Sequence, residues 1–241
     1  MHPPLTCPHF LCLSASPILN PEMSTQTQMM EHVVLFGVKN TIEPSKVREM
    51  VDRINSLSLL DEVLHLTAGP VLRIRSSSLN FTHIYHSRYS SKQHFDAYTA
   101  HPHHLAVVQA NANICGDAMA LDWLSDLQAD PVLPSGSVVR VTLLKLKDGL
   151  GDQVRKEILE VVRGTRGKFG QISQFSCGEN LSPERSEGFS IGSLAVFAGM
   201  SELEAVDSND EFVKYQKDNI GENLESLMVV DYVVPSPLHS N

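Results

Sequence analysis

Short apolar runs typical of β-strands recur along the chain at one nearly constant spacing. Three pairs of segments share it, the first two offset by 108 residues and the third by 109: 32–36 with 140–144, 81–84 with 189–192, and 119–123 with 228–232. The members of each pair also match in character, for example Met-Ala-Leu-Asp-Trp with Met-Val-Val-Asp-Tyr. A repeat of this length predicts two tandem copies of one structural unit.

Each copy also contains helical patterns between its strand-like runs. Apolar residues spaced as on one face of a helix form a stripe in each copy: Val47, Met50, Val51 and Ile54, then Val154, Ile158, Val161 and Val162. A further strand is expected at 62–75 and at 170–177, followed by a second helix that carries Tyr98 or Tyr215. The order is therefore β-α-β-β-α-β, which is that of the ferredoxin-like fold.

This order leaves one face of each sheet uncovered. Both helices of a unit lie on the same face, so the apolar side chains of the other face must be buried elsewhere, and a second sheet of the same kind can cover them. A short linker favours this pairing within one chain. We therefore predict an α+β fold, two tandem ferredoxin-like units forming an intrachain dimeric α/β barrel. The predicted parts are a disordered extension (1–29), a first domain (30–128), a linker (129–137) and a second domain (138–235).

Composition and charge exclude several classes of partner. The net charge of the 241 residues is −9, whereas affinity for nucleic acid comes from clustered Lys and Arg, so no nucleic-acid partner is expected. No apolar run approaches the roughly 20 residues of a membrane span, and no membrane association is expected. Cys7, Cys12, Cys115 and Cys177 form no paired motif, which indicates free thiols in a reducing compartment. An intracellular, cytoplasmic protein without cofactor is expected.

A group of histidines raises the question of a metal site. Six lie close together in sequence: His83, His86, His94, His101, His103 and His104. Zinc sites combine histidines with Cys or carboxylate ligands at fixed spacing, and that spacing is missing here. Strand alternation also places His83 and His86 on opposite faces. No metal site is predicted.

Several motifs resemble one protein family. Residues 31–36 (Glu-His-Val-Val-Leu-Phe), 95–104 (with Ala-His-Pro-His-His at its end) and the loop 178–189 are similar to elements of the stress-response A/B barrel family, often abbreviated Dabb. The resemblance spans about residues 30–235, and some members of the family are stress or antifungal defence proteins. The tandem arrangement is similar to a plant subgroup of the family. Some members of that subgroup are associated with peroxisomes, which makes a peroxisome the alternative compartment. Residues 237–241 do not form a Ser-Lys-Leu type signal.

The resemblance also implies site residues. In one plant branch of the family, a histidine of the His-Pro-x-His element is the base in an intramolecular aldol condensation that cyclises linear polyketides. A tyrosine six residues earlier holds it, and a first-strand histidine lines the pocket. The matching positions are His104, Tyr98 and His32. The second copy has Arg140 at the strand position and no histidine after Tyr215, so the resemblance implies a single site in the first domain.

Three functions stay open at this point. The first is a non-enzymatic stress or defence protein, or one that binds a small apolar or aromatic ligand. The second is a polyketide-cyclase-like enzyme, and the third is a module that self-associates. A catalytic His104 would lie within hydrogen-bond reach of Tyr98 and face a cavity, whereas a structural His104 would bond to backbone. Trp123 and Tyr232 are expected to pack at the barrel rim.

Overall fold

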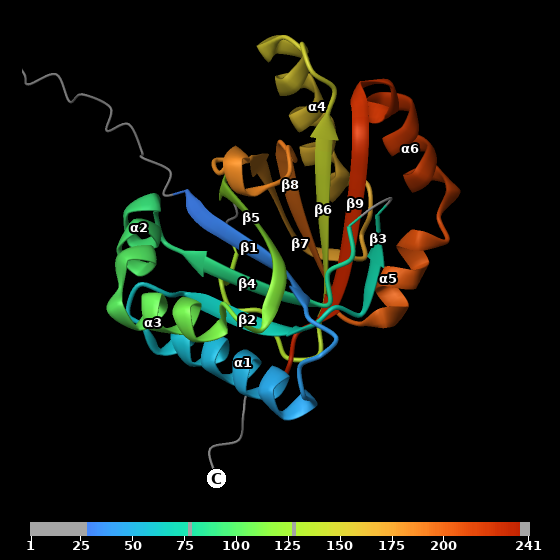
Figure 1. Cartoon of the computed structure of the whole chain (residues 1–241). Coiled ribbons are helices and arrows are strands. Elements are labelled where there is room, and N and C mark those ends of the chain that lie inside the picture. Colours follow the sequence, from blue (N-terminus) through green and yellow to red (C-terminus); the bar gives the residue numbers. More distant parts are fainter. Residues whose placement is uncertain (1–27, 77–78, 127–128, 237–241) are drawn as a thin grey trace, which may run out of the picture.

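The computed structural model describes residues 28–76, 79–126 and 129–236, and it contains two antiparallel sheets with helices on their outer faces (Figure 1). The first sheet has the order β2-β4-β1-β5 and contains β1 (Met29–Val38), β2 (His65–Pro70), β4 (His83–Tyr89) and β5 (Cys115–Ser125). Its helices are α1 (Pro44–Ser56), α2 (Lys92–Ala100) and α3 (Pro102–Asn111). Up to residue 27, the predicted N-terminal extension lies outside the described residues.

The second sheet repeats this arrangement and adds one strand. Its order is β3-β9-β6-β8-β7, with β3 (Arg73–Arg75), β6 (Val138–Leu146), β7 (Ile172–Glu179), β8 (Ile191–Phe197) and β9 (Leu224–Val233). Its helices are α4 (Asp152–Gly164), α5 (Met200–Asp207) and α6 (Asp210–Ile220). Single 3₁₀ turns occur at η1 (Leu57–Leu59), η2 (Thr165–Gly167), η3 (Pro183–Arg185) and η4 (Gly221–Asn223). The predicted fold of two ferredoxin-like units is confirmed.

Strand alternation separates two environments in each domain. On β1, Val33 and Leu35 are fully buried and point toward the second sheet, while His32, Val34 and Phe36 point toward the helices. Helix α1 begins at Pro44, and its apolar stripe buries Met50 and Ile54 over this outer face. Each sheet therefore has an inner face that belongs to the shared barrel and an outer face that belongs to its own domain.

The two domains exchange segments at their edges, which differs from the prediction of one strand over 62–75. That segment is two strands: β2 stays in the first sheet, whereas β3 pairs with β9 of the second, and Leu72 N–H donates to the Asp231 carbonyl at 2.8 Å. In return, Leu181 N–H beyond β7 donates to the Asp122 carbonyl of β5 at 2.7 Å. Unpaired edge groups favour such additions, and the exchange closes the barrel.

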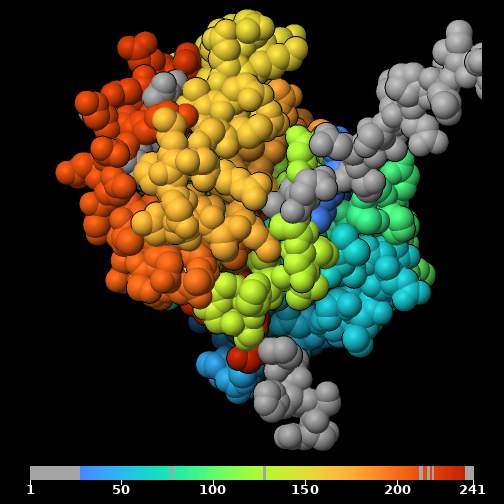
Figure 2. All heavy atoms as spheres, turned by 180° about the vertical axis from the view of Figure 1, so that it is seen from behind, coloured from blue at the N-terminus to red at the C-terminus, as the bar shows by residue number. Residues whose placement is uncertain are grey.

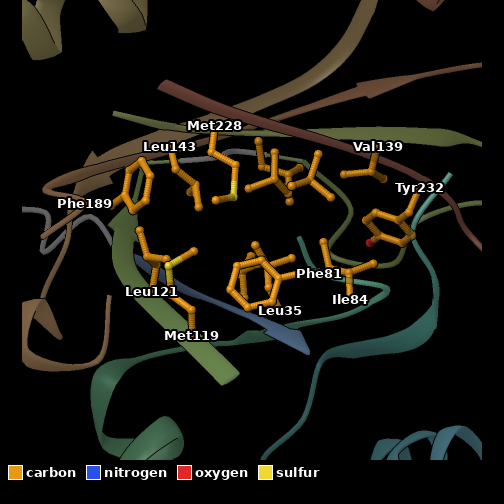
Figure 3. Packing of buried hydrophobic residues seen from close by; sticks show 14 of the residues in the cluster. Leu35, Phe81, Ile84, Met119, Leu121, Val139, Leu143, Phe189, Met228 and Tyr232 are labelled. Carbon is orange, nitrogen blue, oxygen red and sulfur yellow. The ribbon is translucent and has the colours of Figure 1, made fainter. Parts of the chain in front are cut away.

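The inner faces form one core between the sheets. Figure 3 shows Leu35, Phe81, Ile84, Met119 and Leu121 of the first domain opposite Val139, Leu143, Phe189, Met228 and Tyr232 of the second. Seen from behind, the two domains pack side by side, and the chain around residues 129–137 runs along the seam (Figure 2). Because each domain supplies one side of this core, neither can bury its inner face alone.

Trp123 and Tyr232 lie inside this core, so the expected position at the rim is wrong. Both are 0% exposed. The Trp123 indole packs on Gly192 and Gly178 of the second domain: a Cβ on Gly192 would be 2.7 Å from Trp123 Cε3, and one on Gly178 would be 2.8 Å from the Leu124 carbonyl oxygen. The glycines supply space for the largest side chain, which the pattern of a single strand cannot reveal.

A buried charged cluster also joins the domains. The Glu31 carboxylate accepts hydrogen bonds from His86 Nε2 at 2.7 Å and from Arg88 Nε at 3.2 Å, and Arg88 Nη1 donates to Gln174 Oε1 of the second domain at 2.9 Å. Burial raises the pKa of Glu31, but Arg88 and His86 outweigh it and lower that pKa to about 2. Beside them, burial lowers the pKa of His65 to about 3.

Alanine at Gly178 tests the close contact between the domains. We expect Gly178→Ala to lower the free energy of unfolding by about 1–3 kcal/mol, because the added methyl group meets backbone that cannot move aside. Gly69→Ala is the matched control, since Gly69 occupies the equivalent place in β2 and an added Cβ meets nothing within 4 Å. Urea denaturation measures the free energy of unfolding of both variants. Equal losses in the two would contradict the close packing of Trp123 on Gly178.

Acid sensitivity tests the burial of His65. Its pKa of about 3 in the folded chain lies below the ordinary 6.5, so as the pH falls below 6.5 the unfolded chain gains a proton that the folded chain does not. Stability should therefore fall between about pH 6.5 and 3. We expect His65→Gln to reduce that slope by up to about 1.4 kcal/mol per pH unit. An exposed control, His103→Gln, should keep the wild-type slope in urea titrations, and an unchanged slope in His65→Gln would contradict the account.

Candidate functional site

A cavity of about 600 Å³ lies between the outer face of the first sheet and the helices of the first domain. All three predicted site residues, His32, Tyr98 and His104, line it. Much of the remaining wall is apolar: Val34, Phe36, Ile54, Leu57, Val107, Val108, Met119 and Ala120. Residues from three separate parts of the sequence are thus brought to one space of a size that small-molecule sites have.

The break between α2 and α3 positions His104. Pro102 interrupts the helix, and His101 Nδ1 accepts the N–H of His103, which would otherwise bond to the Thr99 carbonyl. His104 Nδ1 donates to that carbonyl instead, at 3.1 Å. The neutral ring therefore carries its proton on Nδ1, and Nε2 is the basic nitrogen. Burial lowers the pKa of His104, although the bond to Thr99 opposes this, so the neutral form is favoured.

Tyr98 contacts His104 through its ring, with centroids 4.5 Å apart. The expected orienting hydrogen bond from Tyr98 to His104 is replaced by the one to Thr99. The Tyr98 hydroxyl instead accepts from the Tyr85 hydroxyl at 2.8 Å, and Ser87 donates to Tyr85 at 2.8 Å. Burial raises the pKa of Tyr98 far above its usual value. Tyr98 therefore positions His104 by packing, while its hydroxyl belongs to a buried network. His104 faces a cavity, as a catalytic base would, but its ring bonds to backbone, which is the feature expected of a structural histidine.

His32 is held by a carboxylate that the sequence reasoning missed. It pairs directly with Asp122 across β1 and β5, and its Nδ1 donates to Asp122 Oδ1. Both residues are buried, at 4% and 1% exposure. Burial raises the pKa of Asp122, but hydrogen bonds from His32 and Ser182 and the charge of Arg185 lower it below its ordinary value. The carboxylate can only accept, so His32 also carries its proton on Nδ1.

The second domain completes this site. Ser182 and Arg185 lie on the η3 loop, where the Ser182 hydroxyl and Arg185 Nη2 both donate to Asp122 Oδ2, the latter at 2.6 Å. Arg185 lines the cavity, and its side chain is 46% exposed. Asp122 stands in the repeated Asp-aromatic pair, which was a usable signal. The contact of Arg185 with Asp122 depends on how the two domains pack, so no local sequence pattern predicts it.

This arrangement is suited to proton transfer. Two imidazoles line one cavity, and each has its Nδ1 proton held by an acceptor, so that Nε2 is the basic nitrogen of the ring. A carboxylate behind His32 stabilises the positive charge that develops when Nε2 takes a proton. The apolar, largely buried surroundings of His32 and Asp122 strengthen this interaction. The site therefore offers one or two bases to an acidic C–H, N–H or O–H group.

The equivalent positions of the second domain have a different chemistry. Arg140 stands in place of His32 and bonds to Asp231, the counterpart of Asp122, at 2.7 Å. The Tyr215 hydroxyl donates to the Val161 carbonyl at 3.0 Å.

Within ranges 28–76, 79–126 and 129–236, no three His, Cys, Asp or Glu side chains are grouped to hold a metal ion. His83 pairs with Phe36 and His86 with Val33, which places the two histidines on opposite faces as predicted. Cys115 and Cys177 are free thiols, and Cys7 and Cys12 lie outside the described residues. None of the helices described has the length and apolar character needed to cross a membrane.

Comparison with known proteins identifies the family. The model of the Stress responsive A/B Barrel Domain matches twice, at residues 30–125 and 138–234. The chain belongs to this family, with two such domains in tandem.

Its relatives include plant proteins of similar length. One stress-response A/B barrel domain-containing protein of Arabidopsis thaliana is 45% identical over 218 residues, which cover 90% of this chain and 82% of that protein. A second Arabidopsis protein of the same description is 41% identical over 213 residues, covering 87% of this chain and 99% of that protein. A solved structure of a proposed monooxygenase from Fusobacterium nucleatum superposes with a TM-score of 0.61 at 15% identity, covering 87% and 94%, which shows a shared fold.

Proposed function

We propose that this stress-response barrel protein binds a small, largely apolar ligand with an acidic or enolisable group in the cavity of its first domain. The observation that carries the proposal is the pair of histidines, His32 and His104, lining one apolar cavity with their Nδ1 protons already held. Two oriented imidazoles beside an apolar cavity can bind or deprotonate a ligand that enters it. The description of the plant relatives as stress-response proteins supports the biological setting.

Arg185 supports an acidic ligand. Within the described part of the chain, both hydrogen bonds that its side chain donates come from Nη2, one to Asp122 and one to Ser182, while Nε lies 3.8 Å from a carboxylate oxygen of the exposed Glu184. These contacts leave Nη1 for a ligand at the half-exposed cavity wall, and guanidinium is well matched to carboxylate. Aromatic acids and linear β-keto acids combine that group with a body that fits the aliphatic wall.

Ligand-induced stabilisation tests this proposal. We expect an aromatic acid or a β-polyketo acid to raise the free energy of unfolding of the wild-type protein, by about 2.7 kcal/mol at a concentration 100 times its dissociation constant. His104→Ala should lose most of this stabilisation, because its ring lines the cavity. Thermal unfolding with a panel of such acids measures it.

The matched control is His103→Ala, which removes an exposed histidine one residue away on the same helix and should respond as wild type. If no compound stabilises the wild-type protein, or if His104→Ala responds as strongly, the cavity is not the binding site.

A second candidate function is cyclisation of a linear polyketide by an intramolecular aldol reaction. The pairing of His32 with Asp122 favours it, because a carboxylate-supported imidazole is a common general base. In this reaction a histidine Nε2 takes a proton from the carbon between two carbonyls. That carbon attacks a distant carbonyl carbon, a C–C bond forms as the C=O π bond opens, and the resulting alkoxide takes a proton back from an imidazolium.

Turnover separates this candidate from simple binding. We expect wild-type protein to convert a linear β-polyketo acid to a cyclic product, and we expect His32→Gln and His104→Gln to slow it at least about 100-fold. His103→Gln should match wild type. The assay follows the change in ultraviolet absorbance as the cyclic aldol product loses water and becomes aromatic. If the wild-type protein binds the acid but forms no product, cyclisation is excluded and ligand binding remains the function.

A further inference from the structure

The second domain contains a cavity of its own, although its sequence suggested only a structural partner. It has a volume of about 310 Å³ and lies on the outer face of the second sheet, beneath α4, α5 and α6. Arg140 lines it at the position that His32 has in the first domain. This cavity lies apart from the proposed site and shares no lining residue with it.

Its size sets it apart from ordinary packing defects. Protein interiors contain few voids larger than a water molecule, whereas small-molecule sites begin at about 300 Å³. The walls come from all four long strands of the sheet and from the helices above them. Most are buried apolar side chains: Leu144, Val162, Ile172, Phe175, Ala195, Phe197, Val206 and Ile220. The exposed Leu227 and Gly221 also line it and place an opening beside η4.

Among the described residues of this wall, the one charged group is already neutralised. Arg140 is 5% exposed, and its Nε donates to Asp231 Oδ1 at 2.7 Å while Nη1 donates to Asp207 Oδ1 at 2.6 Å. Nη2 donates to both carboxylates, to Asp207 at 3.1 Å and to Asp231 at 3.0 Å. Arg73 of the first domain also donates to both carboxylates. An anionic ligand would therefore find no unpaired cation in the described wall, and its charge would be costly to bury.

The remaining polar groups point to the same class of ligand. They are the hydroxyls of Thr142, Thr165 and Ser193, which carry no charge, and the Ser193 hydroxyl donates to the Thr142 carbonyl at 3.4 Å. The described residues that line this cavity include neither histidine nor carboxylate. We propose that the second-domain cavity is a separate binding site for a neutral apolar molecule, such as an alkyl or aromatic compound, and that it has no part in proton transfer. The two domains thus bind ligands of different chemistry.

Cavity-filling variants of the full chain test this proposal, with the neutral fluorophore N-phenyl-1-naphthylamine as probe. Ala195→Leu fills the second-domain cavity, and Ala120→Leu is the matched change in the first-domain cavity. We expect wild type and Ala120→Leu to bind the probe with similar affinity. Ala195→Leu should bind it at least tenfold more weakly. The anion 1-naphthoate should bind at least tenfold more weakly than the probe at that site.

A second variant keeps the test decisive if Ala195→Leu does not fold. Ser193→Leu fills the same space from the same strand and should lower the affinity for the probe to a similar degree. Cooperative unfolding of each variant shows that its chain is folded. The proposal is overturned if wild type does not bind the probe, or if binding survives in both second-domain variants and is lost in Ala120→Leu. Equal affinity for 1-naphthoate at the second site would overturn the assignment of a neutral ligand.

Discussion

The structure depends on the burial of two apolar sheet faces against each other. Each four-stranded unit covers its outer face with its own helices, so its inner face has to be covered by the other unit. The contact is specific: Trp123 packs on Gly178 and Gly192, and the Glu31–Arg88 pair reaches Gln174. The two repeats therefore form one barrel, and the site in the first domain is completed by the second.

The repeat keeps a carboxylate and changes its partner. Asp122 and Asp231 occupy equivalent strand positions, but the first orients the imidazole of His32 and the second neutralises the guanidinium of Arg140. One cavity consequently has basic nitrogens, while the described wall of the other has no available charge. Each pair also receives an arginine from the opposite domain, Arg185 or Arg73. The same scaffold thus supports two environments, one suited to acid–base chemistry and one to neutral ligands.

The features that the sequence predicted correctly are those that local patterns determine. The repeat spacing predicted the fold and the tandem order, and strand alternation placed His83 and His86 on opposite faces. The positions of His32, Tyr98 and His104 at one cavity followed from the family resemblance. Packing between distant segments was not predictable: β3 joins the opposite sheet, Trp123 enters the core, and Arg185 reaches Asp122. His104 bonds to the Thr99 carbonyl while the Tyr98 hydroxyl bonds to Tyr85, and the spacing of Tyr98 and His104 alone does not decide this choice of partners.

The most direct test of this account is to cut the chain between its domains. A protease site inserted after the exposed Ser135 allows the folded protein to be cleaved within the linker. If the inner faces form one shared core, the two fragments should stay together as one particle in size-exclusion chromatography and unfold in a single transition. Separation into two folded fragments that unfold independently would contradict it, because each inner face would then be stable without the other.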